Sequence, residues 1–147
     1  MANPLRLREL SDPDRHVIEK AYARWAPLYD AICGPIFETG RRAAAAAARE
    51  VGGRILEVGV GTGLSFSDYD QTTEIVGIDL SEPMVAKAQA RLASGQYPHV
   101  KSVMVMDAEN LAFPDASFNC VVAQFVITLV ADAERVLTEC ARAVRPG

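Results

Sequence analysis

Three glycines at alternate positions follow a short apolar run in the segment RILEVGVGTGL, which begins at Arg54. They are Gly59, Gly61 and Gly63, and Glu57 stands two residues before the first of them. Glycine lets the backbone adopt a positive φ and lets a ligand come close, because it has no Cβ. The spacing therefore predicts a turn after a strand, where the backbone approaches a small molecule.

Two common phosphate-binding turns do not match this spacing. A P-loop has the form G-x-x-x-x-G-K-[ST], and no lysine follows these glycines. The dinucleotide fingerprint has the form G-x-G-x-x-G, but Leu64 stands where its third glycine would be. An NAD-linked oxidoreductase therefore remains only as an alternative from another class of protein.

Two carboxylates follow the next two apolar runs along the chain. Asp79 ends the run IVGID, and Asp107 follows the run VMVM. At the carboxyl end of a parallel strand, a carboxylate faces the ligand crevice, and its two oxygens can accept from both hydroxyls of a ribose. Asp79 is therefore the candidate ribose-binding residue, with a helix cap as its alternative role. Asp107 on its own fits an ordinary loop carboxylate as well.

The elements that must position these residues alternate between strand and helix. Apolar runs predict strands at 55–58, 75–78, 103–106 and 120–125, and helical patterns cover 63–69, 83–94 and 131–144. Continuously apolar strands separated by helices are typical of a parallel sheet with both faces covered. We therefore expect an α/β core over residues 51–147, preceded by a helical segment over residues 1–50.

The N-terminal segment has a different character from the core. It carries predicted helices at 11–27 and 35–50, and Tyr22 and Trp25 lie on an apolar stripe of the first. Residues 1–49 hold eight Lys/Arg against six Asp/Glu, whereas the rest of the chain holds seven against thirteen. A basic segment joined to an acidic body can serve as a surface-binding arm.

Composition narrows the class of protein. A chain of 147 residues suits one domain, and its net charge of −4 argues against a nucleic-acid-binding surface. Its three cysteines lack metal-type spacing, so we expect no metal site and a reducing compartment. With neither a signal peptide nor a membrane span in the sequence, we expect a cytoplasmic protein. His16 and His99 fall outside the motifs and are expected at the surface.

Taken in order, the glycine loop, Asp79 and Asp107 resemble the class I S-adenosylmethionine-dependent methyltransferases over about residues 50–147. The resemblance implies a Rossmann-like, mostly parallel sheet, of which the first four strands are present, and S-adenosylmethionine as the cofactor. The cofactor-binding residues that it implies are Glu57, Gly59, Gly61, Gly63, Asp79, Leu80, Met84, Asp107, Ala108, Glu109, Ala123 and Gln124.

The resemblance also implies roles for several of these residues. Leu80 and Met84 would flank the adenine, and Asp107 with the backbone N–H that follows it would meet the adenine edge. Ala123 and Gln124 would lie beside the reactive methyl group, with plain strand residues as their alternative role.

The segments YARWAPLYD, FETGRRAA, LEVGVGTG, GIDLSEPM, VMDAENLAFPD and VVAQFVIT closely resemble the soluble bacterial phosphatidylethanolamine N-methyltransferases. This resemblance implies methyl transfer to the amine of phosphatidylethanolamine, on the way to phosphatidylcholine. It implies that Tyr22 and Tyr29 line the methyl-transfer site. It also implies an N-terminal helix that rests on an anionic membrane surface, so that the protein is peripherally associated with the inner membrane.

Two alternatives stay open for the function. A small-molecule or quinone methyltransferase of the same fold is one, because the pair Tyr29-Asp30 before the glycine loop also occurs in such enzymes. A cofactor-binding domain without catalysis is the other. The sequence stops where the resemblance implies a fifth strand, after Arg145-Pro146-Gly147. We therefore expect a shortened form of a longer enzyme, with weak activity or with a second chain covering the exposed sheet edge.

Overall fold

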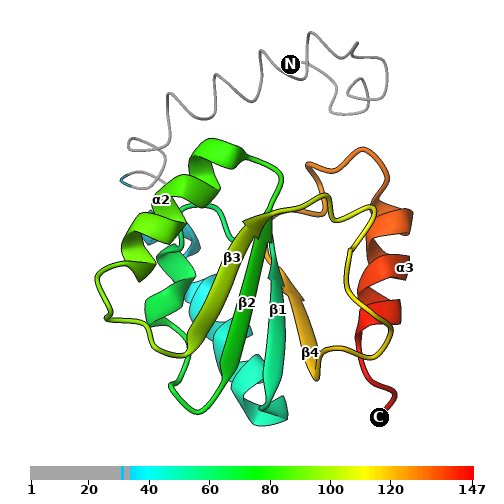
Figure 1. Ribbon diagram of the computed structural model, residues 1–147, viewed down its shortest axis with the longest axis horizontal. Coiled ribbons are helices and arrows are strands. Elements are labelled where there is room, and N and C mark those ends of the chain that lie inside the picture. The colour runs from blue at the N-terminus through cyan, green and yellow to red at the C-terminus, as the bar shows by residue number, and fades with distance from the viewer. Residues whose placement is uncertain (1–30, 32–33) are drawn as a thin grey trace, which may run out of the picture.

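A computed structural model describes residue 31 and residues 34–147 of the chain. A helix over 34–51 comes first, and strands and helices then alternate (Figure 1). In chain order they are β1 (Arg54–Val58), the 3-10 helix η2 (Leu64–Ser67), β2 (Glu74–Asp79), α2 (Glu82–Leu92), β3 (Val100–Val105), β4 (Cys120–Ala123) and α3 (Ala133–Ala143). The predicted helix at 11–27 lies outside the described residues.

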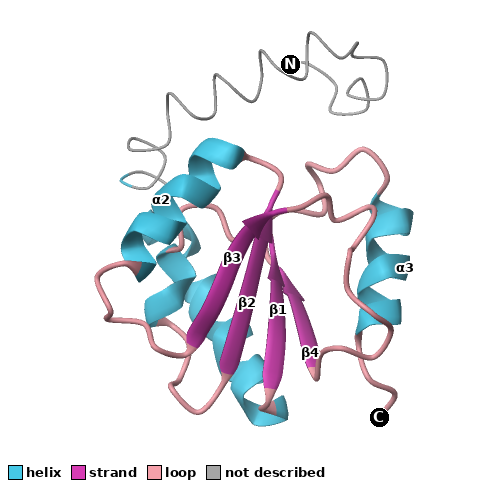
Figure 2. Cartoon of the chain, viewed as in Figure 1, coloured by secondary structure: helices cyan, strands magenta, loops and turns pink. Residues whose placement is uncertain are grey.

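The four described strands form one parallel sheet in the order β3-β2-β1-β4 (Figure 2). The predicted parallel α/β sheet is thus confirmed. In its register, Val58 at the end of β1 pairs with Ile78 of β2 and with Ala123 of β4. The carboxyl ends of these strands therefore meet at one edge of the sheet, where the loops that follow them can share a ligand.

Buried apolar side chains cover both faces of the sheet. Ile55 packs in a cluster with residues of helix 34–51, η2 and α2, whereas Leu56 and Val58 pack in a second cluster with α3. Successive strand residues point to opposite faces, which explains this alternation along β1. Figure 1 accordingly shows α2 and α3 on opposite sides of the sheet. Within the described ranges, no helix is long and apolar enough to cross a membrane.

Several element boundaries differ from those expected. The segment predicted as a helix at 63–69 forms only the short η2, and the fourth strand ends at Ala123 instead of Phe125. Phe125 has a φ of 55°, which is incompatible with a strand. The third strand begins at Val100, three residues earlier than the apolar run indicated.

The expectation that His99 lies at the surface is wrong. Its side chain is only 5% exposed, and its Nε2 atom lies 2.8 Å from the carbonyl oxygen of Phe66. This contact ties the residue before β3 to η2. This hydrogen bond satisfies one of the two buried ring nitrogens of His99. The other histidine, His16, lies outside the described residues.

Candidate cofactor site at the carboxyl ends of the strands

The glycine loop is held onto the end of β2 by its own backbone. The N–H groups of Gly59 and Val60 both donate to the carbonyl oxygen of Ile78, at 2.9 and 3.0 Å. Gly61 and Gly63 have φ values of 57° and 84°, which glycine adopts without strain. A Cβ on Gly61 would meet nothing within 4 Å. The loop therefore has one open side, at Gly61, where a ligand can approach the backbone.

Asp79 links two loops at the carboxyl end of β2. Its Oδ2 accepts a hydrogen bond of 2.9 Å from the N–H of Gly61, and its Oδ1 accepts one of 2.9 Å from the N–H of Ser81. Burial raises the pKa of this carboxyl above its ordinary value, and the backbone N–H groups act in the opposite direction. Each oxygen has two lone pairs, so both can still accept from a ribose hydroxyl. Ser81, not Asp79, is the N-cap residue of α2.

Leu80 and Met84 follow Asp79 and differ in their exposure. The side chain of Leu80 is 56% exposed, and that of Met84, in the first turn of α2, is 8% exposed. An exposed leucine beside a half-buried carboxylate offers an apolar surface next to a polar anchor. Such a surface suits a flat base, and the expected adenine contact stays a prediction.

The segment after β3 is tied to α3 by Glu109. Its Oε1 accepts a hydrogen bond of 2.9 Å from the N–H of Asp132, which caps α3, and its carbonyl oxygen accepts one of 2.7 Å from Nε of Arg135. The N–H of Glu109 donates to Oδ1 of Asp107 at 2.9 Å. The Glu109 carboxylate therefore fixes the start of α3, a role that the sequence did not indicate. The expected parts of Asp107, Ala108 and Glu109 in cofactor binding stay predictions.

A cluster of polar side chains is buried beneath the glycine loop. Glu57 is 3% exposed, and its Oε2 accepts a hydrogen bond of 2.8 Å from Oγ of Ser65 in η2. Burial raises the pKa of this carboxyl to about 7, although the bond from Ser65 acts in the opposite direction. Tyr69 lies in the same cluster, and burial, followed by the charge of Glu57, raises the pKa of its hydroxyl. Ser65 and Tyr69 were not expected from the sequence as members of this site.

Gln124 lies at the carboxyl end of β4, directly after Ala123. Its Oε1 and Nε2 atoms are buried without a hydrogen-bond partner among the described residues. An unpaired buried amide is costly, so these atoms are available to a ligand at the expected position of the methyl group.

Helix 34–51 is attached to the loop that follows η2. Nε of Arg41 donates to Oδ2 of Asp68 at 3.1 Å, and both side chains are largely buried. The guanidinium also donates to the carbonyl oxygen of Gly34 at 2.8 Å. Arg41 therefore anchors the helix beside the glycine loop.

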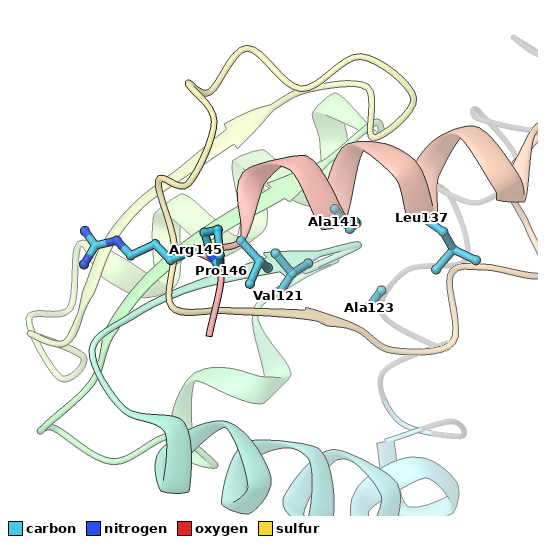
Figure 3. Close-up of a pocket in the computed structure, with 8 residues that line it drawn as sticks. Val121, Ala123, Leu137, Ala141, Arg145 and Pro146 are labelled. Carbon is cyan, nitrogen blue, oxygen red and sulfur yellow. The ribbon is translucent and has the colours of Figure 1, made fainter.

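An apolar groove lies between β4 and α3, lined in part by Val121, Ala123, Leu137 and Ala141 (Figure 3). In the described sheet, β4 pairs with β1 alone, so the groove lies beside its free edge. The expectation that a second chain covers this edge stays a prediction. Tyr22 and Tyr29, expected at the methyl-transfer site, lie outside the described residues. No group of metal-binding side chains occurs in the part of the chain that the structure describes.

The strand order, the glycine loop and the carboxylate at the end of β2 together define an α/β protein with a candidate ligand crevice at its switch between β1 and β4. The family model described as a methyltransferase domain matches residues 56–147. The chain therefore belongs to the methyltransferase domain family, and its cofactor is S-adenosylmethionine. The site residues fit this molecule, since Asp79 keeps free acceptor positions, Gly61 is open and Gln124 is unpaired.

Two similar proteins differ in the acceptor that their names give. The chain is 43% identical over 130 residues to phosphatidylethanolamine N-methyltransferase of Cereibacter sphaeroides, an alignment that covers 88% of this chain and 64% of that protein. It is 35% identical over 100 residues to ubiquinone/menaquinone biosynthesis C-methyltransferase UbiE of Geobacter sulfurreducens, covering 65% of this chain and 39% of that protein. The chain thus spans less than two thirds of the length of either relative.

A solved structure confirms the fold. The putative S-adenosyl-L-methionine-dependent methyltransferase from Methanococcus maripaludis superposes with a TM-score of 0.71 at 16% identity, covering 88% of this chain and 60% of that chain. At this identity the likeness concerns the fold alone. The Rossmann-like sheet that the sequence predicted is therefore confirmed by both the strand order and a known structure.

Proposed function

We propose that the chain transfers methyl groups from S-adenosylmethionine to the amine of phosphatidylethanolamine, on the way to phosphatidylcholine. The observation that carries this proposal is the 43% identity over 88% of the chain to a phosphatidylethanolamine N-methyltransferase. An alignment of that extent includes much of the N-terminal segment as well as the cofactor-binding core. Acceptor specificity depends on segments added to a shared fold, so similarity beyond the core bears on the substrate.

The reaction needs alignment more than it needs reactive side chains. The cofactor supplies a methyl group on a positively charged sulfur, which is already electrophilic. A neutral amine nitrogen attacks the methyl carbon, the carbon–sulfur bond breaks, and the resulting ammonium group gives up a proton before any further transfer. Holding the two reactants in line can contribute about 7–11 kcal/mol to the lowering of the barrier.

The described residues support the cofactor side of this proposal. Asp79 holds the ribose, and Gly61 lets the amino-acid end of the cofactor lie against the backbone. The unpaired amide of Gln124 orients the groups around the transferred methyl. Because β1, β2 and β4 end at the same edge, these three contacts come from residues at or just beyond the ends of fixed strands, which keeps the reacting atoms in register.

We further propose that the N-terminal segment brings this site to the lipid. The support is in the sequence, where Tyr22 and Trp25 share an apolar stripe with basic residues nearby. A helix of this kind inserts shallowly among lipid head groups, and its cations are attracted to anionic lipids. Tyr22 and Tyr29 would then stand between the membrane and the methyl-transfer site, and the protein would be peripherally bound to the cytoplasmic face of the inner membrane.

A quinone precursor is the second candidate acceptor, favoured by the 35% identity to the Geobacter protein. One assay separates the candidates: labelled S-adenosylmethionine is offered with phosphatidylethanolamine vesicles, with soluble ethanolamine and with a demethylated quinone. We expect label in the lipid fraction. Label in the quinone alone would reverse the choice of acceptor, and cofactor binding without any transfer would favour a non-catalytic domain.

A further inference from the structure

Three consecutive residues follow β4, and the proposed reaction so far uses only the first of them, Gln124. Gln124 has a buried, unpaired amide, Phe125 has a left-handed backbone with a φ of 55°, and Val126 lies against the glycine loop. A Cβ on Gly59 would come within 2.9 Å of Cβ of Val126. The loop after β4 therefore packs directly on the glycine loop, on the same side as the expected methyl group.

Phe125 is held in this conformation by helix 34–51. Its ring lies 4.3 Å, centroid to centroid, from the ring of Phe37, with the two planes tilted by 39°. Its edge also stands over Gly40, where an added Cβ would meet Cζ of Phe125 at 3.0 Å. Bulky residues rarely adopt positive φ, and such strained conformations cluster at active sites and ligand-binding loops, where the surroundings enforce them.

The ring of Phe125 is nevertheless not buried. It is 48% exposed, whereas a phenylalanine that served only to fill the core would be covered. The positive φ of Phe125 and the absence of a side chain at Gly40 together keep the aromatic ring at the surface, directly after Gln124. An aromatic face that lies next to a reaction centre attracts cations, because the ring carries negative charge above and below its plane.

We propose that Phe37 and Phe125 bind the alkylammonium head group of the methyl acceptor through their rings. This rests on the proposed function, because only an amine acceptor becomes a methylated cation during the reaction. Methylation spreads the positive charge over an apolar surface, which matches an aromatic pair better than a hydrogen-bonding group does. The pair therefore holds partly methylated acceptor more firmly than the starting amine, and so favours repeated transfer.

A binding experiment tests the charge recognition without depending on turnover. The full chain, saturated with S-adenosylhomocysteine, is titrated by NMR with phosphocholine and with 3,3-dimethylbutyl phosphate, which has the same shape and no positive charge. We expect a preference for phosphocholine of about fivefold, the size of a partly exposed cation–π contact. Phe125→Leu and Phe37→Leu should bring the ratio to about one, and Phe125→Tyr should keep it.

Two further variants separate recognition from folding. Ile36→Ala, an exposed residue beside Phe37 on the same helix, is the matched control and should leave the ratio unchanged. Gly40→Ala should keep or raise the melting temperature, since alanine favours a helix, yet it should lower the ratio by displacing the Phe125 ring. A ratio near one in the unmodified chain, or an unchanged ratio in Phe125→Leu, overturns the proposal.

The lipid assay shows which of the two proposals fails. If phosphatidylethanolamine vesicles are methylated but phosphocholine and its neutral analogue bind equally, the aromatic site is wrong and the function stands. If no lipid is methylated but Phe125→Leu abolishes the charge preference, the acceptor assignment is wrong and the aromatic site stands. Soluble phosphoethanolamine in a parallel assay shows whether the ammonium group must belong to a lipid.

Discussion

The backbone N–H of Gly61 donates a hydrogen bond of 2.9 Å to Oδ2 of Asp79, and this bond joins the glycine loop after β1 to the end of β2. The other oxygen of the same carboxylate accepts from the N–H of Ser81, which begins α2. One side chain therefore orders both loops that face the cofactor. Its loss should affect the shape of the site as well as the proposed contact with the ribose.

Asp79→Asn should weaken binding of S-adenosylhomocysteine by about 100-fold, because bonds to a charged group contribute about 1.5–3 kcal/mol each. The asparagine side chain retains a single acceptor oxygen. Its NH2 group, which can only donate, would face a backbone N–H or a ribose hydroxyl that also donates. Isothermal titration calorimetry measures the effect. Asp115→Asn, at an exposed carboxylate, is the control. An unchanged dissociation constant in Asp79→Asn would refute the ribose assignment.

Gly61 and Gly63 should respond differently to alanine. A Cβ on Gly63 would clash with the ring of Phe66, whereas one on Gly61 meets open space. Both residues have positive φ, so each substitution costs about 1–2 kcal/mol of backbone strain. Gly63→Ala should lose about 3 kcal/mol or more of unfolding free energy when the core clash is added. Gly61→Ala should lose only the roughly 1–2 kcal/mol of unfolding free energy that the backbone strain costs, yet it should bind S-adenosylhomocysteine much more weakly.

Urea unfolding and calorimetry of the two variants, side by side, make the comparison. If Gly61→Ala and Gly63→Ala lost the same stability, a Cβ at position 61 would not find the open space that the structure shows there. Unchanged cofactor affinity in Gly61→Ala would show that the ligand does not approach the loop there.

The parallel sheet and the position of Asp79 at the end of β2 could be predicted from the sequence, because strand runs and the residues at their ends are local patterns. The contact between Glu57 and Ser65 could not, since it depends on the turn geometry of η2, which was expected as a longer helix. The bond from Asp132 to Glu109 joins residues far apart in the sequence, so no spacing rule indicates it. The position of His99 was predicted wrongly, because the sequence around a single histidine does not indicate that the distant carbonyl oxygen of Phe66 will be its hydrogen-bond partner.

Glu57 should make stability depend on pH. Its folded pKa of about 7 lies above the ordinary value of 4.5, so folding favours the neutral form. The contribution of the neutral Glu57 carboxyl to the unfolding free energy is complete below pH 4.5, and it is lost as the pH rises through 7. A shift of this size corresponds to about 3 kcal/mol.

Glu57→Gln, which cannot ionise, isolates this dependence. The difference in unfolding free energy between the unmodified chain and this variant should fall by about 2–3 kcal/mol from pH 4.5 to pH 8. Urea titrations over that range measure it, and differencing removes the contribution of the other groups. A constant difference would mean that the carboxyl ionises freely in the folded chain.

Glu109 should prove more important for stability than for cofactor binding. Its carboxylate pairs with the N–H of Asp132 at the start of α3, so Glu109→Ala leaves a helix-end donor unpaired. We expect a loss of about 1–2 kcal/mol of unfolding free energy. The affinity for S-adenosylhomocysteine should change far less than in Asp79→Asn. A large loss of affinity with little loss of stability would instead support the cofactor contact expected from the sequence.

Leu137 should control association through the edge of β4. It is exposed on α3 and lines the apolar groove beside the free edge of that strand. Exposed apolar grooves and unpaired strand edges are surfaces on which a second chain can pack. We therefore expect the chain to self-associate as its concentration rises, and Leu137→Glu to weaken this association by about tenfold, since a buried unpaired charge is costly.

Sedimentation velocity over a range of concentrations measures this effect. Val51→Glu, at an equally exposed apolar residue at the end of helix 34–51, is the control and should leave the association unchanged. An unmodified chain that stays monomeric at the highest concentration would contradict the prediction. Equal effects of the two substitutions would show that added charge opposes association in general, and that the groove beside β4 has no particular part in it.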